Sequence, residues 1–165
     1  MAEDVVDRVA AAWARELPGV TGLELELGKR AARLAAFLSQ AVEAELGRLS
    51  LTRAEYEVLA VLRSVGPPYQ MRPSDIANRL VLSSGGTSNV LRRLAAEELL
   101  ERDPHPQDAR GAWVRLSARG IQIAEDAVRA ASRAQAAVLR DVPQADQRAA
   151  ADALRTVLLG LRDTV

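Results

Sequence analysis

The chain of 165 residues contains no cysteine. This absence excludes disulfides, thiolate zinc sites and sensing by thiol oxidation. The only histidine, His105, lies between two prolines and has no second histidine to pair with, so we expect no metal site and no histidine general base. The sequence also has no nucleophile–base set and no glycine-rich phosphate loop, and we therefore expect neither an enzyme nor a cofactor.

Long hydrophobic runs are missing as well. No segment approaches the roughly 18 consecutive apolar residues of a membrane-spanning helix, and no signal peptide opens the sequence. We therefore expect a cytoplasmic protein without a membrane partner. The formal net charge is zero, with 22 basic and 22 acidic residues, which argues against sequence-independent coating of nucleic acid. Residues 51–120 carry ten arginines against eight acids, so any affinity for DNA must come from local placement of arginines.

Aromatic residues are scarce, at 3%, while hydrophobic residues make up 48% of the chain. Alanine, leucine and arginine dominate, which favours helices in one compact domain. The apolar period predicts a helix from Asp4 to Leu17, and two capping-box pairs, Thr21 with Glu24 and Thr52 with Glu55, predict the next two helix starts. Ser117 is the expected cap of a later helix, which Val142-Pro143 separates from a last one.

Two short helices are predicted in the middle of the chain. The first begins at Pro73, where a missing N–H costs nothing, and ends before the Ser-Ser-Gly-Gly run at 83–86. In the second, the apolar period places four residues on one side: Thr87, Val90, Leu91 and Leu94. The other side carries Gly85, Ser88, Asn89, Arg92 and Arg93. This side has donors, little bulk and no acid, which suits a DNA groove, although a solvated helix face has the same composition.

Two strand-like runs follow, residues 99–102 and residues 112–116, joined by a loop with Pro104 and Pro106. Asp108 and Arg110 lie two positions apart near the tip of this loop. The carboxylate can hold the guanidinium in one rotamer, ready for a narrow minor groove, although an exposed ion pair of little energetic weight is the alternative.

This order predicts a winged helix-turn-helix: a mainly α fold with a small β-wing, flanked by N- and C-terminal dimerisation helices. The predicted DNA-binding residues are Ser84, Gly85, Thr87, Ser88, Asn89, Arg92, Arg93 and Arg110, with Asp108 stabilising the wing. The long apolar terminal helices exceed what such a core needs, and we expect a homodimer on a near-palindromic operator with half-sites roughly 34 Å apart. An intramolecular helical cap on a monomer is the alternative.

Residues 51–120 resemble the DNA-binding core of MarR-type transcriptional regulators. LTRAEYEVLAVL stands where the family has the helix before the motif, Asp108-Ala109-Arg110 matches its D-x-R wing motif, and LSARG resembles the entry into its long C-terminal dimerisation helix. The resemblance implies three parts: N-terminal dimerisation helices over 1–50, which also form the wall of any ligand pocket, a DNA-binding lobe over 51–120, and C-terminal dimerisation helices over 121–165.

The N-terminal AAWARELPGV is similar to the extra helix of a urate-responsive branch of this family. The resemblance implies that Trp13, Glu57 and Arg102 line a ligand site, with Glu57 replacing an aspartate. Val90 departs from the pattern, because the branch has an arginine there and a valine cannot pair with an anionic purine. Each residue has an ordinary alternative: helix packing for Trp13, a solvated helix face for Glu57, and a phosphate contact or wing salt bridge for Arg102.

The sequence therefore predicts a dimeric, sequence-specific DNA-binding regulator, in this family most often a repressor that a small anionic or aromatic ligand releases from its operator. The alternative is a winged-helix module that uses the same surfaces to bind protein. The operator, the regulated genes, the effector and the sign of regulation are not readable from the residues.

Overall fold

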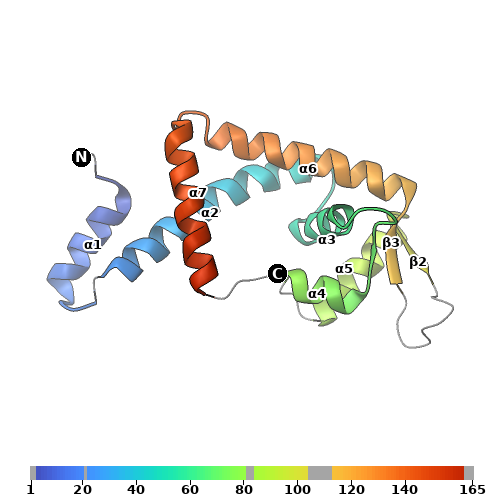
Figure 1. The fold of residues 1–165 in the computed structure, drawn as a ribbon, viewed down its shortest axis with the longest axis horizontal. Helices are drawn as coiled ribbons and strands as arrows, with labels where there is room; N and C mark the ends of the chain where they lie inside the picture. Colours follow the sequence, from blue (N-terminus) through green and yellow to red (C-terminus); the bar gives the residue numbers. More distant parts are fainter. Residues whose placement is uncertain (1–2, 21, 81–83, 104–112, 162–165) are drawn as a thin grey trace. The chain divides into compact units, whose positions relative to one another are not determined.

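A computed structural model describes residues 3–20, 22–80, 84–103 and 113–161. It divides into two compact units, residues 1–41 and residues 42–165, with the boundary inside the second helix. The elements in chain order are α1 (Val5–Glu16), α2 (Leu23–Arg48), α3 (Arg53–Ser64), β1 (Gln70–Met71), α4 (Pro73–Leu80), α5 (Ser84–Ala96), β2 (Leu100–Asp103), β3 (Trp113–Leu116), α6 (Ala118–Val138) and α7 (Gln144–Gly160) (Figure 1). Within these ranges, no helix is long and apolar enough to cross a membrane.

The first unit consists of α1 and the N-terminal part of α2. Asp4 caps α1 by accepting hydrogen bonds from the Val6 and Asp7 N–H groups, and the Asp7 carboxylate bonds back to the Asp4 N–H. Arg30 of α2 then joins the two helices, because its guanidinium contacts Asp4 at 2.9 Å and Asp7 at 2.7 Å. Glu26, one turn before Arg30, accepts a third bond at 2.7 Å. One arginine thus contacts three carboxylates where α1 begins.

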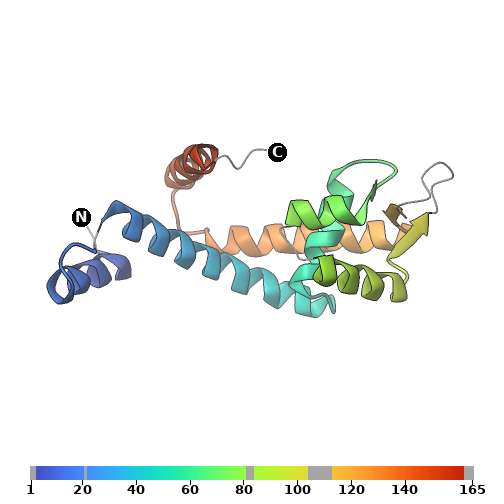
Figure 2. The ribbon, with the colours of Figure 1, turned by 90° about the horizontal axis from the view of Figure 1, so that it is seen from below.

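In the second unit, α3 is the central helix. Val58, Leu59 and Leu62 are completely buried, and α3 packs against α4, α5, α6 and strand β3. The helix starts where the sequence predicts, since Thr52 and Glu55 form both halves of the capping box. In Figure 2, α4 and α5 lie on either side of α3, with the sheet at the N-terminal end of α6. This core fixes the helix-turn-helix to the rest of the unit.

The three strands form an antiparallel sheet in the order β1-β3-β2. Leu100 pairs with Leu116 and Arg102 with Val114, while Met71 of the short edge strand pairs with Val114 from the other side. Leu100, Val114, Leu116 and Met71 are buried, so one face of the sheet belongs to the core. The predicted wing strands are therefore confirmed, and the winged helix-turn-helix fold with them.

Helix α6 leaves the sheet and packs on the C-terminal end of α2. Val42 and Leu46 of α2 meet Ala127 and Ala131 of α6, and all four residues are buried. Arg63 adds an ion pair from α3 to Glu125 of α6 at 2.9 Å, and this guanidinium holds the pKa of the Glu125 carboxyl below its ordinary value. By contrast, no residue of α7 among those described is buried.

Gly120, in the first turn of α6, lies close against Leu99, the residue before β2. A Cβ atom placed on Gly120 would lie 2.0 Å from the Leu99 carbonyl oxygen, far inside van der Waals contact. Ser117 caps the same turn by accepting a hydrogen bond from the Gly120 N–H at 2.9 Å. The missing side chain is what lets α6 start against the sheet.

We expect Gly120→Ala to lower the free energy of unfolding by about 1 to 3 kcal/mol or more, because the backbone at Leu99 must move. Gly47→Ala is the matched control, since Gly47 lies in α2 with open space around its Cβ position and gains up to about 1 kcal/mol of helix propensity. Chemical denaturation of both variants measures the difference. Equal stability of the two variants would contradict the close approach.

The cap of α1 predicts that the stability of the N-terminal helices depends on pH. The hydrogen bond from Arg30 is the largest cause that lowers the pKa of Asp4 below its ordinary value of 3.8. A carboxyl with a lowered folded pKa stabilises the fold above its unfolded pKa, and this stability is lost as the pH falls through the folded value. We expect the N-terminal helices to loosen as the pH falls below the ordinary Asp pKa of 3.8, as followed by circular dichroism and N-terminal proteolysis. Arg30→Ala should loosen them at neutral pH and flatten the acid transition.

Candidate nucleic-acid interface

The inner face of α5 anchors the helix in the core. Thr87, Leu91 and Leu94 are 2%, 3% and 1% exposed, and they repeat at helical spacing. They pack where α5 meets α3, α4 and β2. The core therefore determines which face of α5 points outwards.

The outer face carries the residues that the sequence assigns to DNA. Gly85, Ser88, Asn89, Arg92 and Arg93 are all exposed. The first turn has no acid, and Arg92 donates a hydrogen bond to the Asn89 side-chain oxygen one turn earlier. Thr87 differs from the others, because its side chain is buried against the core. Ser84 begins α5, but its side chain lies outside the described residues.

Arg93 is also held by a partner on another helix. Its guanidinium contacts the carboxylate of Glu55 on α3, with an Nη2–Oε1 distance of 3.0 Å, and the Glu55 side chain is only 5% exposed. The sequence identified Glu55 as a capping residue and gave no sign of this second contact. The capping-box pattern correctly predicted that the Glu55 carboxylate lies at the start of α3. The approach of α5 to this point depends on how the helices pack, which no local pattern shows.

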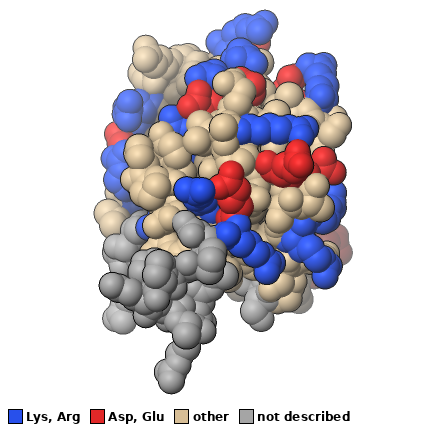
Figure 3. All heavy atoms as spheres, turned by 90° about the vertical axis from the view of Figure 1, so that its right-hand side faces the viewer, with Lys and Arg blue, Asp and Glu red and all other residues tan. Residues whose placement is uncertain are grey.

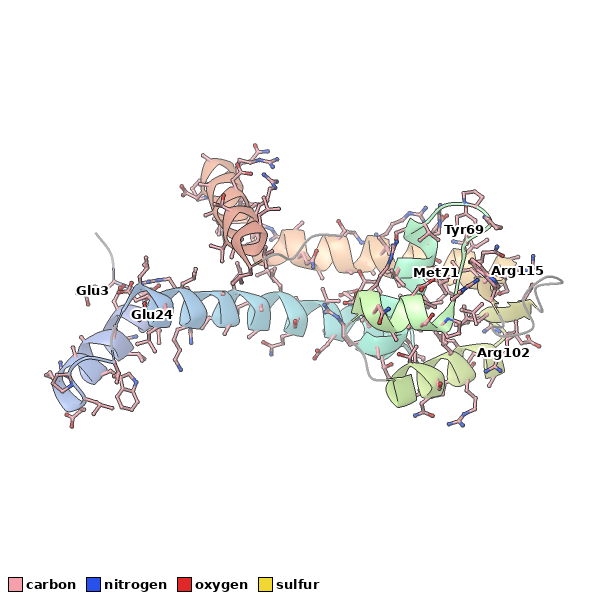
Figure 4. The ribbon with its side chains drawn as sticks, turned by 60° about the horizontal axis from the view of Figure 1, so that its bottom comes forward. Glu3, Glu24, Tyr69, Met71, Arg102 and Arg115 are labelled. Atoms are coloured by element: carbon pink, nitrogen blue, oxygen red, sulfur yellow. The ribbon has the colours of Figure 1, made fainter. Side chains whose placement is uncertain are left out.

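The wing is described only at its base. Arg115 of β3 pairs with Glu101 of β2 at 2.7 Å, and Arg72 lies over the Trp113 ring at 5.4 Å. Trp113 is thus a strand residue of the wing, as the sequence predicts. Arg102 is exposed on β2, and Figure 4 shows it with Arg115 at the sheet end of this unit (Figure 4). The predicted wing-tip residues Asp108 and Arg110, like His105, lie outside the described residues.

The charge on this end of the unit is mixed. In Figure 3, which looks onto the end that carries the sheet, basic and acidic side chains alternate over the described surface. This pattern agrees with the zero net charge of the chain. The described surface at this end is therefore not uniformly basic.

The three predicted ligand residues lie on separate elements. Trp13 belongs to the first unit, on α1, and is 44% exposed. Glu57 and Arg102 belong to the second unit, on α3 and β2. Glu57 pairs with Arg53 of the same helix at 2.7 Å. The ligand site that these residues were expected to form stays a prediction.

Comparison with known proteins gives consistent results. Residues 49–111 match the MarR family. The regulator PecS of Dickeya dadantii is 25% identical over 118 residues, which cover 72% of this chain and 71% of PecS. The crystal structure of AbsC, a MarR family regulator from Streptomyces coelicolor, superposes with a TM-score of 0.72 at 21% identity over 99% of this chain and all of AbsC. A mutant MarR from Escherichia coli complexed with operator DNA gives a TM-score of 0.71 at 21% identity over 88% of this chain and 97% of that one.

The fold, the α5 face and these matches define the class of protein: a winged helix-turn-helix transcriptional regulator. The chain is similar to the MarR family, which its residues 49–111 match, and to PecS over 72% of its length. Members of this family regulate transcription and are not enzymes, in agreement with the sequence-based expectation.

Proposed function

We propose that the protein is a homodimeric repressor that binds a near-palindromic DNA operator and is released from it by a small anionic or aromatic ligand. The observation that carries the proposal is that α5 has one face buried in the core and the opposite face exposed. Its inner residues Thr87, Leu91 and Leu94 are locked in the core, so its small, acid-free outer face is held towards solvent. A helix fixed in this way is what readout in a major groove requires.

The roles on this face follow from side-chain chemistry. Gly85 and Ser88 leave room for a phosphate near the positive end of the helix dipole. Asn89 can pair with a base edge, and Arg92 with guanine or phosphate. The hydrogen bond between Arg92 and Asn89 pre-orders these two side chains before DNA arrives. From the wing, Arg110 is the proposed contact to the minor groove, and Asp108 is its proposed support.

A dimer is supported by apolar surface outside the core. At the C-terminal end of α7, Leu158 and Leu159 of the helix and the C-cap residue Leu161 are 46%, 58% and 72% exposed. In the first unit, Leu23 and Phe37 are 78% and 54% exposed. Burial of such side chains in a two-fold interface would place two copies of α5 about one helical turn of DNA apart. A regulator of this kind acts on chromosomal DNA, so we expect it in the cytoplasm.

The second candidate is a winged-helix module that binds an acidic protein surface. The zero net charge and the mixed charge of the sheet end favour neither ligand by themselves. Selection from random duplexes distinguishes the two functions, because only a DNA reader enriches a sequence. Light scattering on the same preparation gives the mass of the particle. A monomer that enriches no duplex would contradict the proposal.

We expect Asn89→Ala to relax base preference, with about 1 to 3 kcal/mol less discrimination against mismatched operators. Competition binding with single-base operator variants measures this change. Gln122→Ala is the matched control, since Gln122 is an exposed amide on α6 whose partner is Asp126. An equal loss of affinity for every duplex would mean that Asn89 contacts only phosphate.

We expect Trp13→Ala to keep operator affinity and to weaken the response to the effector. The exposure of Trp13, 44%, supports this, because nearly half of its surface is accessible to a ligand. A thermal-shift screen of small aromatic anions, urate included, identifies ligands by the rise in melting temperature that they cause. Trp13→Phe is the control and should retain the response. Unfolding of Trp13→Ala without ligand would instead assign Trp13 a structural role.

A further inference from the structure

Glu55 is a buried acid with partners on two elements. The residue is 4% exposed. Its Oε2 atom accepts hydrogen bonds from the Thr52 N–H at 2.8 Å and the Thr52 hydroxyl at 2.7 Å, and its Oε1 atom contacts Arg93 Nη2 at 3.0 Å. A single carboxylate thus joins the first turn of α3 to the last turns of α5.

The two neighbouring arginines of α5 have different partners. Arg92 bonds to Asn89 on the outer face of the same helix, whereas Arg93 reaches across to another helix. Both side chains are exposed in part, so sequence and exposure alone do not separate them. Their partners indicate that Arg92 is available to a phosphate or base beside Asn89, and that Arg93 is engaged with the core of the unit.

The space next to this ion pair is not filled by side chains. A cavity of about 440 Å³ lies there, lined by residues of the α2–α3 corner, of the C-terminal half of α5 and of the start of α6. Leu51, Leu99 and Ile123 contribute apolar walls. The Glu55–Arg93 contact borders this cavity and joins α3 to α5 beside it.

We propose that Arg93 is a positioning residue, not a DNA-contacting one, and that its ion pair with Glu55 sets the orientation of α5 for DNA. This inference rests on the proposed function. The bond is charge-assisted and the acid is desolvated, so loss of Arg93 leaves the buried Glu55 carboxylate without its countercharge, and loss of the Glu55 charge frees Arg93 from α3. Helix α5 then relaxes at its C-terminal end, and the outer face no longer meets the groove in register.

The proposal and simple electrostatics predict opposite changes in DNA affinity when Glu55 is neutralised. Glu55 is an acid near an interface with phosphates, and its neutralisation should strengthen DNA binding if charge alone matters. If Glu55 positions α5 through Arg93, neutralisation should weaken binding. The sign of the change in affinity therefore separates the two explanations.

The test uses the full-length protein and the duplex that selection enriches, with affinity measured by fluorescence anisotropy over a range of salt concentrations. We expect Glu55→Gln and Arg93→Ala each to weaken binding by roughly fivefold to tenfold, a typical size for coupling between two sites. The double variant should lose no more than Arg93→Ala alone. Arg93→Ala should keep the wild-type salt slope, whereas the matched control Arg92→Ala should reduce the slope by about 0.9, the value for one lost phosphate contact.

A double-mutant cycle in unfolding stability shows independently whether the ion pair forms, and circular dichroism shows that each variant is folded. Tighter or unchanged binding by a folded Glu55→Gln variant would overturn the inference, as would a salt slope for Arg93→Ala that falls as far as that for Arg92→Ala. If the wild-type protein enriches no duplex, the proposed function fails. In that case a non-zero coupling in stability still supports the ion pair as the link between α3 and α5, and zero coupling overturns it.

Discussion

The burial of α3 is the constraint on which the DNA-binding lobe depends. Val58, Leu59 and Leu62 are fully enclosed, and each neighbouring element buries its own apolar face against this helix. Because packed interiors tolerate little displacement, α5 can take up few orientations on α3. The core thereby fixes a surface feature: the stripe of small and basic residues on the outer side of α5 is exposed because the opposite stripe fills the core.

Ion pairs between elements accompany this packing. The chain has as many acids as bases, and many arginines of the described residues have carboxylate partners: Arg30 joins α1 to α2, Arg63 joins α3 to α6, and Arg115 joins the two wing strands. Each of these pairs joins two elements and thereby helps to fix how they are oriented. Because the protein has no excess positive charge, an arginine that is paired with one of its own carboxylates is less available to contact a ligand. The different partners of Arg92 and Arg93 illustrate this difference.

The terminal helices present the opposite situation, with apolar surface that the chain does not bury itself. Helix α7 has an amphipathic sequence and no buried residue among those described, and the first unit exposes large side chains such as Leu23 and Phe37. Surface of this kind is costly in water and marks a site of association. This agrees with the proposed homodimer, in which the same helices would set the distance between two copies of α5.

Local patterns in the sequence determined the helices and the wing strands, because caps and apolar periods act within a few residues. Thr52 with Glu55, Pro73 and Ser117 each predicted a helix start that the structure confirms, and the inner stripe of α5 was readable from its 3.6-residue period. Only the tertiary structure decided which partner each charged side chain meets. Glu55 was readable as a cap but not as the partner of Arg93, and Gly120 gave no sign that it lies against the Leu99 carbonyl. These contacts join residues far apart in the chain, and their geometry exists only once the helices have packed.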